Sequence, residues 1–233
     1  MKVSALIFGY NDYTLQIAKN VVHKYQNITI FKLETDPLRG ELEEYDVELF
    51  DLSDEWTSLE QKHDLEKSIV FCVLEDIAEN IFLTISLRAS FENLTIIGLS
   101  NNKESANKLL MAGANKVIPI VQTTASIIAE MLDKPIVTDV LHSILYEKSD
   151  LKIAQIEVNA HDCFDGKYPA DIEWSRDHGI IVVSVMHADG SSEFIYSSKS
   201  QHHPIEKGDV FVVVGYENDI KNFEKLIGGE KCL

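Results

Sequence analysis

The fold is decided by the stretch Lys2-Val-Ser-Ala-Leu-Ile-Phe-Gly-Tyr-Asn-Asp-Tyr-Thr-Leu15, an apolar strand that runs into a turn and then a helix. In a dinucleotide-binding opening, glycines at the first, third and sixth positions of the turn let the backbone approach a pyrophosphate and seat the helix on the sheet. Here Gly9 holds the first position, whereas Asn11 and Thr14 hold the other two. The sequence therefore keeps the signature of the fold while losing much of its close-approach chemistry. This pattern favours a sensor or assembly module over a nicotinamide dehydrogenase.

Strands and helices alternate over the first 120 residues. After the first strand, further strands are expected at 28–33, 47–50, 68–74, 95–98 and 116–120. The helix after the turn is expected to place one set of side chains on the sheet, namely Leu15, Ala18, Val21, Val22 and Tyr25. Later helices are expected at 79–90 and around 106–110, the latter ended by Gly113. Continuous apolar strands require cover on both faces, so the alternation predicts a doubly wound parallel α/β sheet, a Rossmann-like domain over residues 1–122.

The pattern changes after residue 122. Two helical segments are expected at 123–133 and 136–148, separated by Pro135. The second segment carries an apolar stripe at helical spacing, formed by Ile136, Val140, Leu141, Ile144 and Leu145. A helix that leaves a finished sheet buries such a stripe between domains or across a subunit interface. Residues 123–149 are therefore interpreted as linking or dimerisation helices.

The remaining residues, 150–233, show the period of strands. Candidate strands lie at 153–158, 180–187, 193–196 and 210–214, and Asp189-Gly190 is a hairpin signal between two of them. A closing helix is expected at 217–227. The sequence thus predicts a second, small α+β domain.

Composition narrows the range of partners. The 233 residues carry a net charge of −17, and ten acidic residues fall between Glu34 and Glu55 against Arg39 alone. Such a surface repels phosphate backbones and anionic headgroups, so neither nucleic acid nor direct membrane insertion is expected. The acidic segment is interpreted as a solvated face, with a divalent-cation site as the alternative. No apolar run is long enough to span a membrane, and the three cysteines fit a reducing, cytoplasmic compartment.

Four further segments, in order and at matching separations, resemble the potassium-transport regulators known as RCK or KTN domains. They are the acidic stretch 76–80 after the fourth strand, the Leu-Leu-Met-Ala-Gly-Ala-Asn segment within 107–119, the Gly-Lys turn at 164–167 and the Gly-Asp turn at 204–209. The likeness covers nearly the whole chain. The glycine-poor turn resembles RCK domains of some potassium channels, whereas peripheral Trk and Ktr transporter subunits usually keep more glycines.

The resemblance implies a regulatory gating-ring domain of a potassium channel. Chains of this family pair two-fold, and the pairs form a ring, here expected to be an octamer, that acts on a pore conducting potassium ions. The expected location is the cytoplasm, at the inner face of the cell membrane through the pore partner. The ligand stays open between an adenine nucleotide, NAD(H) and a divalent cation. A peripheral nucleotide-binding Trk/Ktr subunit is the first alternative, and a nicotinamide-dependent oxidoreductase is the second.

The expected cofactor-binding residues are Gly9, Asn11, Thr14, Glu34, Asp51 and Glu75. Glu34 matches the acid that binds a ribose in the family, and Asp51 matches the family's aspartate after the third strand. Asn11 and Thr14 either donate to a phosphate or cap the helix start, with capping favoured. Glu75 follows the fourth strand, at the edge where open α/β sheets place ligands.

Two departures from the family also bear on the ligand. Leu99 stands where a basic residue often follows the fifth strand, and neither Leu99 nor Asn101 matches the acids that bind calcium in one channel ring. Calcium gating through those positions is therefore not expected.

The histidines and cysteines predict no zinc site. The adjacent His202 and His203, and the group around His161 and Cys163, match no zinc pattern. Because no nucleophile, base and acid can be assembled from the spacing, an enzyme is not expected.

Overall fold

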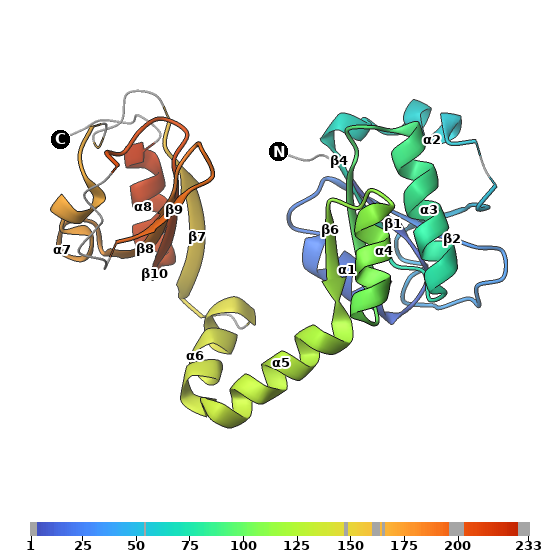
Figure 1. Cartoon of the computed structure of the whole chain (residues 1–233), viewed down its shortest axis with the longest axis horizontal. Coiled ribbons are helices and arrows are strands. Elements are labelled where there is room, and N and C mark those ends of the chain that lie inside the picture. The colour runs from blue at the N-terminus through green and yellow to red at the C-terminus, as the bar shows by residue number, and fades with distance from the viewer. Residues whose placement is uncertain are drawn as a thin grey trace. The chain divides into compact units, whose positions relative to one another are not determined.

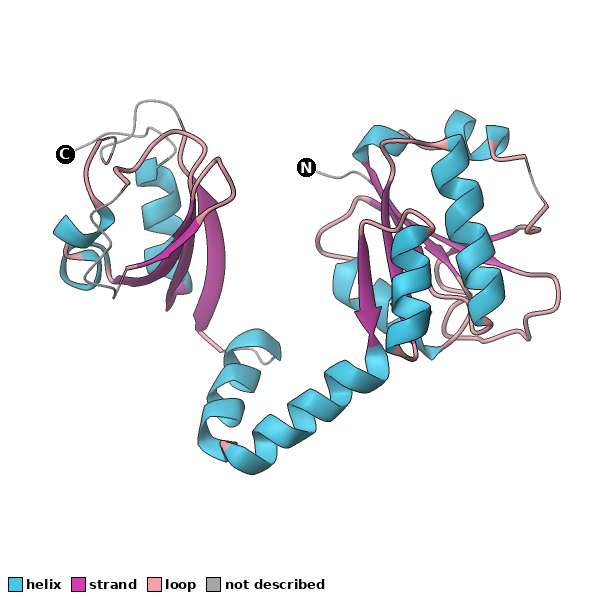
Figure 2. Cartoon of the chain, viewed as in Figure 1, coloured by secondary structure: helices cyan, strands magenta, loops and turns pink. Residues whose placement is uncertain are grey.

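The computed structural model describes residues 4–53, 55–146, 149–159, 164, 166–195 and 203–227. The chain separates into two compact units, Met1–Ala129 and Glu130–Leu233 (Figure 1). Each unit contains its own sheet (Figure 2). The predicted fold class is confirmed: a parallel Rossmann-like sheet is followed by helices and a small antiparallel domain. The boundaries 1–122, 123–149 and 150–233 stay a prediction.

The sheet of the first unit has six strands in the order β3-β2-β1-β4-β5-β6, and every pair is parallel. The strands are β1 (Ser4–Phe8), β2 (Asn27–Lys32), β3 (Asp46–Leu49), β4 (Ser68–Cys72), β5 (Thr95–Ser100) and β6 (Lys116–Pro119). The strand order reverses between β1 and β4. In open α/β sheets this reversal opens a crevice at the carboxyl ends of the strands.

Helices cover both faces of this sheet. One face packs on α1 (Asp12–Val21) through a core that contains Ile7, Ala18, Ile30 and Val73. The other face packs on α2 (Thr57–Lys62), α3 (Ile77–Ser90) and α4 (Lys103–Met111). Its core includes stacked Phe8 and Phe31 rings, whose centroids lie 4.3 Å apart. Side chains that alternate along β1 thus enter two separate cores, as a strand covered on both faces requires.

Three details differ from the expectations. Helix α1 ends at Val21, so Val22 is 45% exposed rather than buried on the sheet. Helix α3 begins at Ile77, two residues earlier than predicted, because the Asp76 side chain caps it by accepting from the N–H groups of Ala78 and Glu79. The first helix after β6 begins at Ile120, directly after that strand, rather than at residue 123.

Two apolar helices follow the first sheet: α5 (Ile120–Asp133) and α6 (Pro135–Tyr146). Pro135 is the first residue of α6, where the missing N–H costs no helical hydrogen bond. Many of their large apolar side chains are exposed, including Ile127, Ile128, Met131, Leu132, Ile136, Val137, Val140, Leu141 and Leu145. Among the described residues, no helix combines the length and the apolar character needed to cross a membrane.

The second unit is built on a four-stranded antiparallel sheet in the order β7-β10-β8-β9. Its elements are β7 (Leu151–Glu157), α7 (Trp174–His178), β8 (Ile180–Met186), β9 (Ser192–Phe194), β10 (Val210–Tyr216) and α8 (Glu217–Ile227). The core packs Trp174 and Phe211 against Phe223 of α8. The closing helix has the predicted bounds, and β9 ends before Tyr196, which lies outside the described residues.

The Arg88 side chain, near the end of α3, connects the segment after α3 to the turn after α4 through hydrogen bonds. Its guanidinium donates to the Oδ1 of Asn115 and to four backbone carbonyls, those of Phe91, Glu92, Leu94 and Gly113. Gly113 has φ +106°, and a Cβ there would lie 2.5 Å from the Cγ of Arg88, so glycine is required for this packing. A single planar cation therefore satisfies carbonyls from both connections.

We predict that Arg88→Lys destabilises the first unit by about 1.5–3 kcal/mol, because a lysine cannot reproduce the fork of donors and leaves carbonyls unpaired. Urea unfolding, followed by a probe within residues 5–120, measures this. Arg176→Lys is the matched control, since Arg176 is exposed and pairs with the adjacent Asp177. Equal and small effects of the two substitutions would contradict the role assigned to Arg88.

Candidate functional site

A pocket of about 190 Å³ opens where the strand order reverses. It is lined by residues at the ends of β5 and after β1, β4, β5 and β6, namely Asn11, Tyr13, Val73, Leu74, Glu75, Ile77, Leu99, Ser100, Asn101 and Ile120. Ligand pockets usually measure about 300–1,000 Å³, so this one fits a single ring or sugar rather than a whole dinucleotide. Its lining combines apolar walls with a few amide, hydroxyl and carboxylate groups.

Gly9 begins the turn next to the pocket. Its φ of +139° lies in the region that favours glycine, and a Cβ at this position would lie 2.7 Å from the carbonyl oxygen of Val73. The turn after β1 therefore approaches the end of β4 as closely as two backbones can. In this chain the glycine serves contact between two parts of the protein itself.

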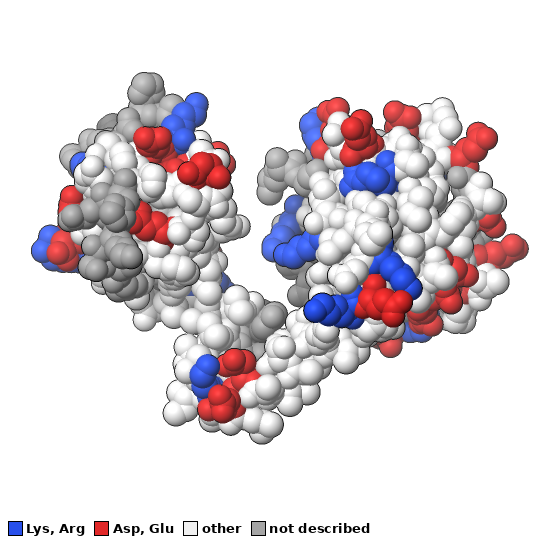
Figure 3. All heavy atoms as spheres, viewed as in Figure 1, with Lys and Arg blue, Asp and Glu red and all other residues white. Residues whose placement is uncertain are grey.

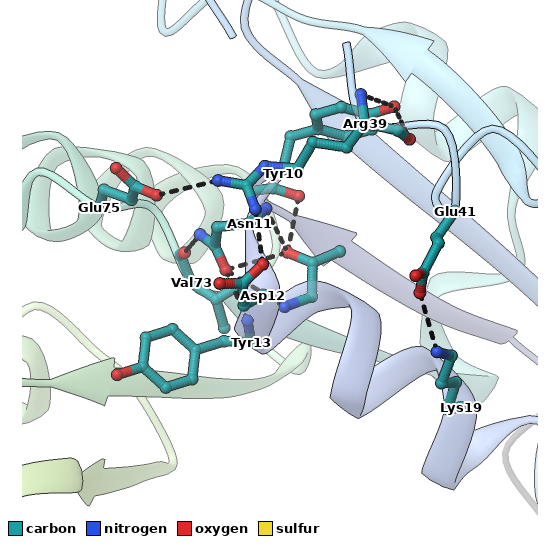
Figure 4. Close-up of polar contacts among 11 residues, drawn as sticks. Tyr10, Asn11, Asp12, Tyr13, Lys19, Arg39, Glu41, Val73 and Glu75 are labelled. Atoms are coloured by element: carbon teal, nitrogen blue, oxygen red, sulfur yellow. Dashed lines mark hydrogen bonds and ion pairs between the residues drawn. The ribbon is translucent and has the colours of Figure 1, made fainter. Parts of the chain in front are cut away.

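Asn11 and Thr14 cap helix α1 from the positions that glycines hold in a phosphate-binding turn (Figure 4). The Oδ1 of Asn11 accepts from the N–H groups of Tyr13 at 3.0 Å and Thr14 at 3.2 Å. Its Nδ2 donates to the carbonyl of Val73 at 2.7 Å. The hydroxyl of Thr14 donates to the carbonyl of Gly9 at 2.9 Å. The predicted capping is confirmed, and a ligand role for both residues stays a prediction.

This cap changes what the start of α1 can bind. Free N–H groups and the positive end of the dipole normally make a helix start an anion site. Here the Asn11 side chain occupies two of those N–H groups, and Asp12 adds a carboxylate to the first turn. A phosphate at this position would displace an amide and face a negative charge. The geometry therefore disfavours the ordinary pyrophosphate position.

Arg39 crosses above the same helix start (Figure 4). Its Nη1 lies 2.6 Å from the Oδ1 of Asp12, and its Nη2 lies 3.9 Å from an Oε1 of Glu75. The hydroxyl of Tyr10 donates to the backbone carbonyl of Arg39 at 3.1 Å and fixes the loop. The guanidinium is thus held between two carboxylates at the edge of the pocket, where its charge is already balanced.

Asn80 fixes the opposite side of the pocket. The residue is fully buried, its Oδ1 accepts from the N–H of Leu74, and its Nδ2 donates to the carbonyls of Cys72 and Leu99. One amide therefore holds the ends of β4 and β5 at a fixed separation. Asn80 belongs to the segment 76–80 that carried the family resemblance, which is the sequence signal for this role.

The structure brings four of the six predicted binding residues together. Asn11 and Glu75 line the pocket, and Gly9 and Thr14 form the turn next to it. Glu34 is exposed after β2, outside the pocket lining. Asp51 also lies outside the lining, and hydrogen bonds from the hydroxyl and N–H of Ser53 lower its pKa. Binding by all six residues stays a prediction.

Sequence reasoning did not assign Arg39, Asn80 or Ile120 to the site. Arg39 has one signal, since it is the single basic residue in the acidic stretch 34–55. Ile120 has none, because its role depends on the place where α5 begins.

The lining of the pocket contains no histidine, cysteine or lysine side chain. Cys72 lies beneath the pocket on β4, and burial raises the pKa of its thiol to about 12, which keeps it protonated and unreactive. Across the described part of the chain, no three histidine, cysteine, aspartate or glutamate side chains already converge to hold a metal ion.

Comparison with known proteins agrees with this architecture. Residues 5–120, the parallel sheet with its helices, match the model of the TrkA-N domain. The chain therefore carries a TrkA-N domain, the amino-terminal half of an RCK domain. This assignment covers the unit that contains the pocket.

Two relatives come from Methanocaldococcus jannaschii. "Probable potassium channel protein 2" is 24% identical over an alignment of 242 residues, gaps included, which covers 99% of this chain and 68% of the relative. "Potassium channel protein 1" is 23% identical over 163 residues, which cover 70% of this chain and 47% of the relative. The chain thus spans two thirds of one relative and about half of the other.

Among solved structures, the human SLO3 gating ring matches 94% of this chain with a TM-score of 0.66 at 12% identity. The matched part is 45% of that chain, and at this identity the likeness concerns the fold alone. The resemblance to RCK domains is shown by the TrkA-N match, and the two relatives relate this chain to potassium channel proteins.

We predict that Asn11→Gly combined with Thr14→Gly raises affinity for ADP or NAD about tenfold or more, because the freed N–H groups at α1 become available to a phosphate. Isothermal titration calorimetry measures the affinity. Ser149→Gly is the matched control, since the Ser149 side chain likewise accepts from a backbone N–H, that of Leu151, and neither residue lines the pocket. An unaltered dissociation constant in the double variant would refute the explanation.

Proposed function

We propose that this chain is a regulatory domain of a potassium channel, one protomer of a gating ring that changes pore opening when a small ligand occupies the pocket. The support is the TrkA-N domain, the two relatives named as potassium channel proteins and the gating-ring fold. On this proposal the domain lies in the cytoplasm, at the inner face of the membrane through its pore partner. It acts by binding and shape change rather than by catalysis.

The observation that carries the proposal is the start of α5 at the pocket. Ile120 lines the pocket and is also the first residue of α5. A ligand that contacts Ile120 therefore acts directly on the helix that leaves the sheet. Such a ligand shifts a conformational equilibrium only if it binds the two ring shapes unequally. Contact with the first turn of α5 supplies that inequality, because a change in the direction of the helix alters the pocket wall.

The surface for assembly is the apolar face of α5 and α6. In Figure 3 the surface of α5 is white along most of its length, with charged side chains gathered towards its carboxyl end. Leu132 is 82% exposed and Ile136 is 78% exposed. Contiguous exposed apolar side chains of this kind mark protein interfaces. The proposed occupant is the same face of a second copy, because two-fold pairing covers both faces at once.

The pocket and its surroundings select the class of ligand. A base or ribose fits the volume, and the amide of Asn101 and the hydroxyl of Ser100, which donates to the Asn102 carbonyl and can still accept, line it. The capped start of α1 leaves the phosphates of an adenine nucleotide or NAD(H) outside their ordinary position. We therefore expect recognition through the nucleoside part. A divalent cation at the acidic segment 34–55 is the alternative input.

A peripheral subunit of a Trk/Ktr-type potassium transporter is the second candidate function. The family model itself favours it, since the matched model is the TrkA-N domain. The two candidates differ in where the pore lies. A pore on the same polypeptide makes this chain part of a channel, and a separately encoded pore makes it a peripheral subunit.

We predict that Leu145→Glu dissociates the oligomer, because the apolar face of α6 would then carry an unpaired charge in a buried interface. Light scattering coupled to gel filtration measures the mass of the purified chain. Leu145 is 55% exposed within one chain, so the substitution leaves the core of the protomer intact. Ile144→Glu tests the neighbouring position on the same helix.

His142→Glu is the matched control for this experiment. It adds the same charge to α6 at an exposed position that lies off the apolar stripe of residues 136, 140, 141, 144 and 145. We expect it to keep the mass of the unaltered chain. Identical masses for Leu145→Glu and His142→Glu would remove α6 from the interface.

A further inference from the structure

The segment between β3 and β4 is held on the sheet by aromatic packing. The ring of Trp56, just before α2, lies 5.7 Å from the ring of Phe8 on β1, and its Nε1 donates to the hydroxyl of Ser86 on α3 at 2.7 Å. Leu59 of α2 is buried in the same core. Because α2 has only six residues, its own hydrogen bonds are insufficient to keep it helical, and it depends on this packing.

His63 ends α2 at the edge of the same core. Its backbone N–H donates to the carbonyl of Leu59 at 3.0 Å, and its ring centroid lies 6.4 Å from that of Phe31 on β2. The Nε2 of the imidazole is buried and has no hydrogen-bond partner among the described residues. Burial lowers the pKa of this imidazole below its ordinary value of 6.5, so the ring is neutral at neutral pH.

The charged groups around the ring do not provide an acceptor for a second ring proton. The acidic side chains of β3 and of the residue after His63 are bound by other side chains: Glu48 by Lys62 at 2.7 Å, Asp46 by Thr29 at 3.2 Å and Asp64 by Lys67 at 2.8 Å. The charges of Glu48 and Asp46 favour a protonated ring, whereas the charge of Lys62 opposes it. Burial outweighs these charges, since the pKa is lowered.

We propose that His63 is an acid-sensitive contact of the first unit: its neutral imidazole holds the end of α2 against the sheet, and a proton on that imidazole weakens the packing of α2. Protonation makes both ring nitrogens donors, so the buried Nε2 becomes an N–H group of a cation without an acceptor. The folded position of the ring therefore disfavours the cation. This inference does not depend on the proposed function of the pocket.

The direction of the pH dependence follows from the lowered pKa. The unfolded chain takes up this proton near the ordinary value of 6.5, whereas the folded chain takes it up only at a lower pH. The contribution of His63 to stability is therefore complete above about pH 6.5 and is lost as the pH falls through the folded-state pKa. The loss should be local, in α2 and in the aromatic contacts of Trp56 with the sheet.

The test is NMR of the full chain, with the pH lowered from about 7.5 to about 5. The Cε1–H signal of the imidazole reports the pKa of His63 in the folded chain, and we expect a midpoint below 6.5. Hydrogen exchange of the His63 amide, corrected for its intrinsic pH dependence, reports opening at the end of α2. We expect its opening constant to rise about threefold or more at the acid end.

Two substitutions remove the titrating group: His63→Gln keeps a polar side chain, and His63→Phe keeps a ring. In both, the opening constant of the amide at position 63 should no longer change over this pH range. His23→Gln is the matched control, because it removes an exposed histidine of the same unit, and it should keep the pH dependence of the unaltered chain. A folded-state midpoint at or above 6.5 would overturn the proposal. An unchanged pH dependence of opening in both His63 variants would overturn it as well.

Discussion

The side chain of Asn11 is the contact on which the ligand edge of the sheet depends. Its oxygen accepts two N–H groups at the start of α1, and its amide nitrogen donates to the carbonyl of Val73 after β4. One residue thus begins the helix and joins the two strands between which the strand order reverses. Gly9 makes this possible, because a Cβ there would collide with the same Val73 carbonyl. The positive end of α1, which faces a phosphate in nucleotide-binding relatives of the fold, here faces an amide of the chain itself.

The other strand ends follow the same principle. Asn80 joins β4 to β5, and Arg39 pairs with the carboxylates above α1, whereas Arg88 joins the connections that follow α3 and α4 before the amino ends of β5 and β6. At the pocket edge, polar side chains therefore satisfy backbone groups and charges of the chain itself. The pocket lies between these contacts. On the proposed function, a small ligand in this pocket acts directly on α5, because Ile120 lines the pocket and begins that helix.

Much of the fold follows from the sequence. Burial on both faces makes residues 69–72 of β4 continuously apolar, and the amphipathic stripe of 217–227 predicts α8 at its observed bounds. The site is harder to predict. The position after a strand fixes a Cα but not a side-chain direction, so Glu75 lines the pocket whereas Glu34 and Asp51 do not. Arg39 comes from a loop without periodicity.

The most direct test is NMR of the backbone amide groups of Tyr13 and Thr14. Their chemical shifts and hydrogen-exchange rates are measured during titration of the chain with ADP and, separately, with adenosine. If the Asn11 side chain holds these N–H groups, they are protected in the free chain, and ADP perturbs them no more than adenosine does. The perturbed signals should then be those of pocket residues such as Ser100, Asn101 and Ile120. A large shift or a new protection of the Tyr13 and Thr14 amides with ADP alone would show that a phosphate displaces the cap, and would contradict the account.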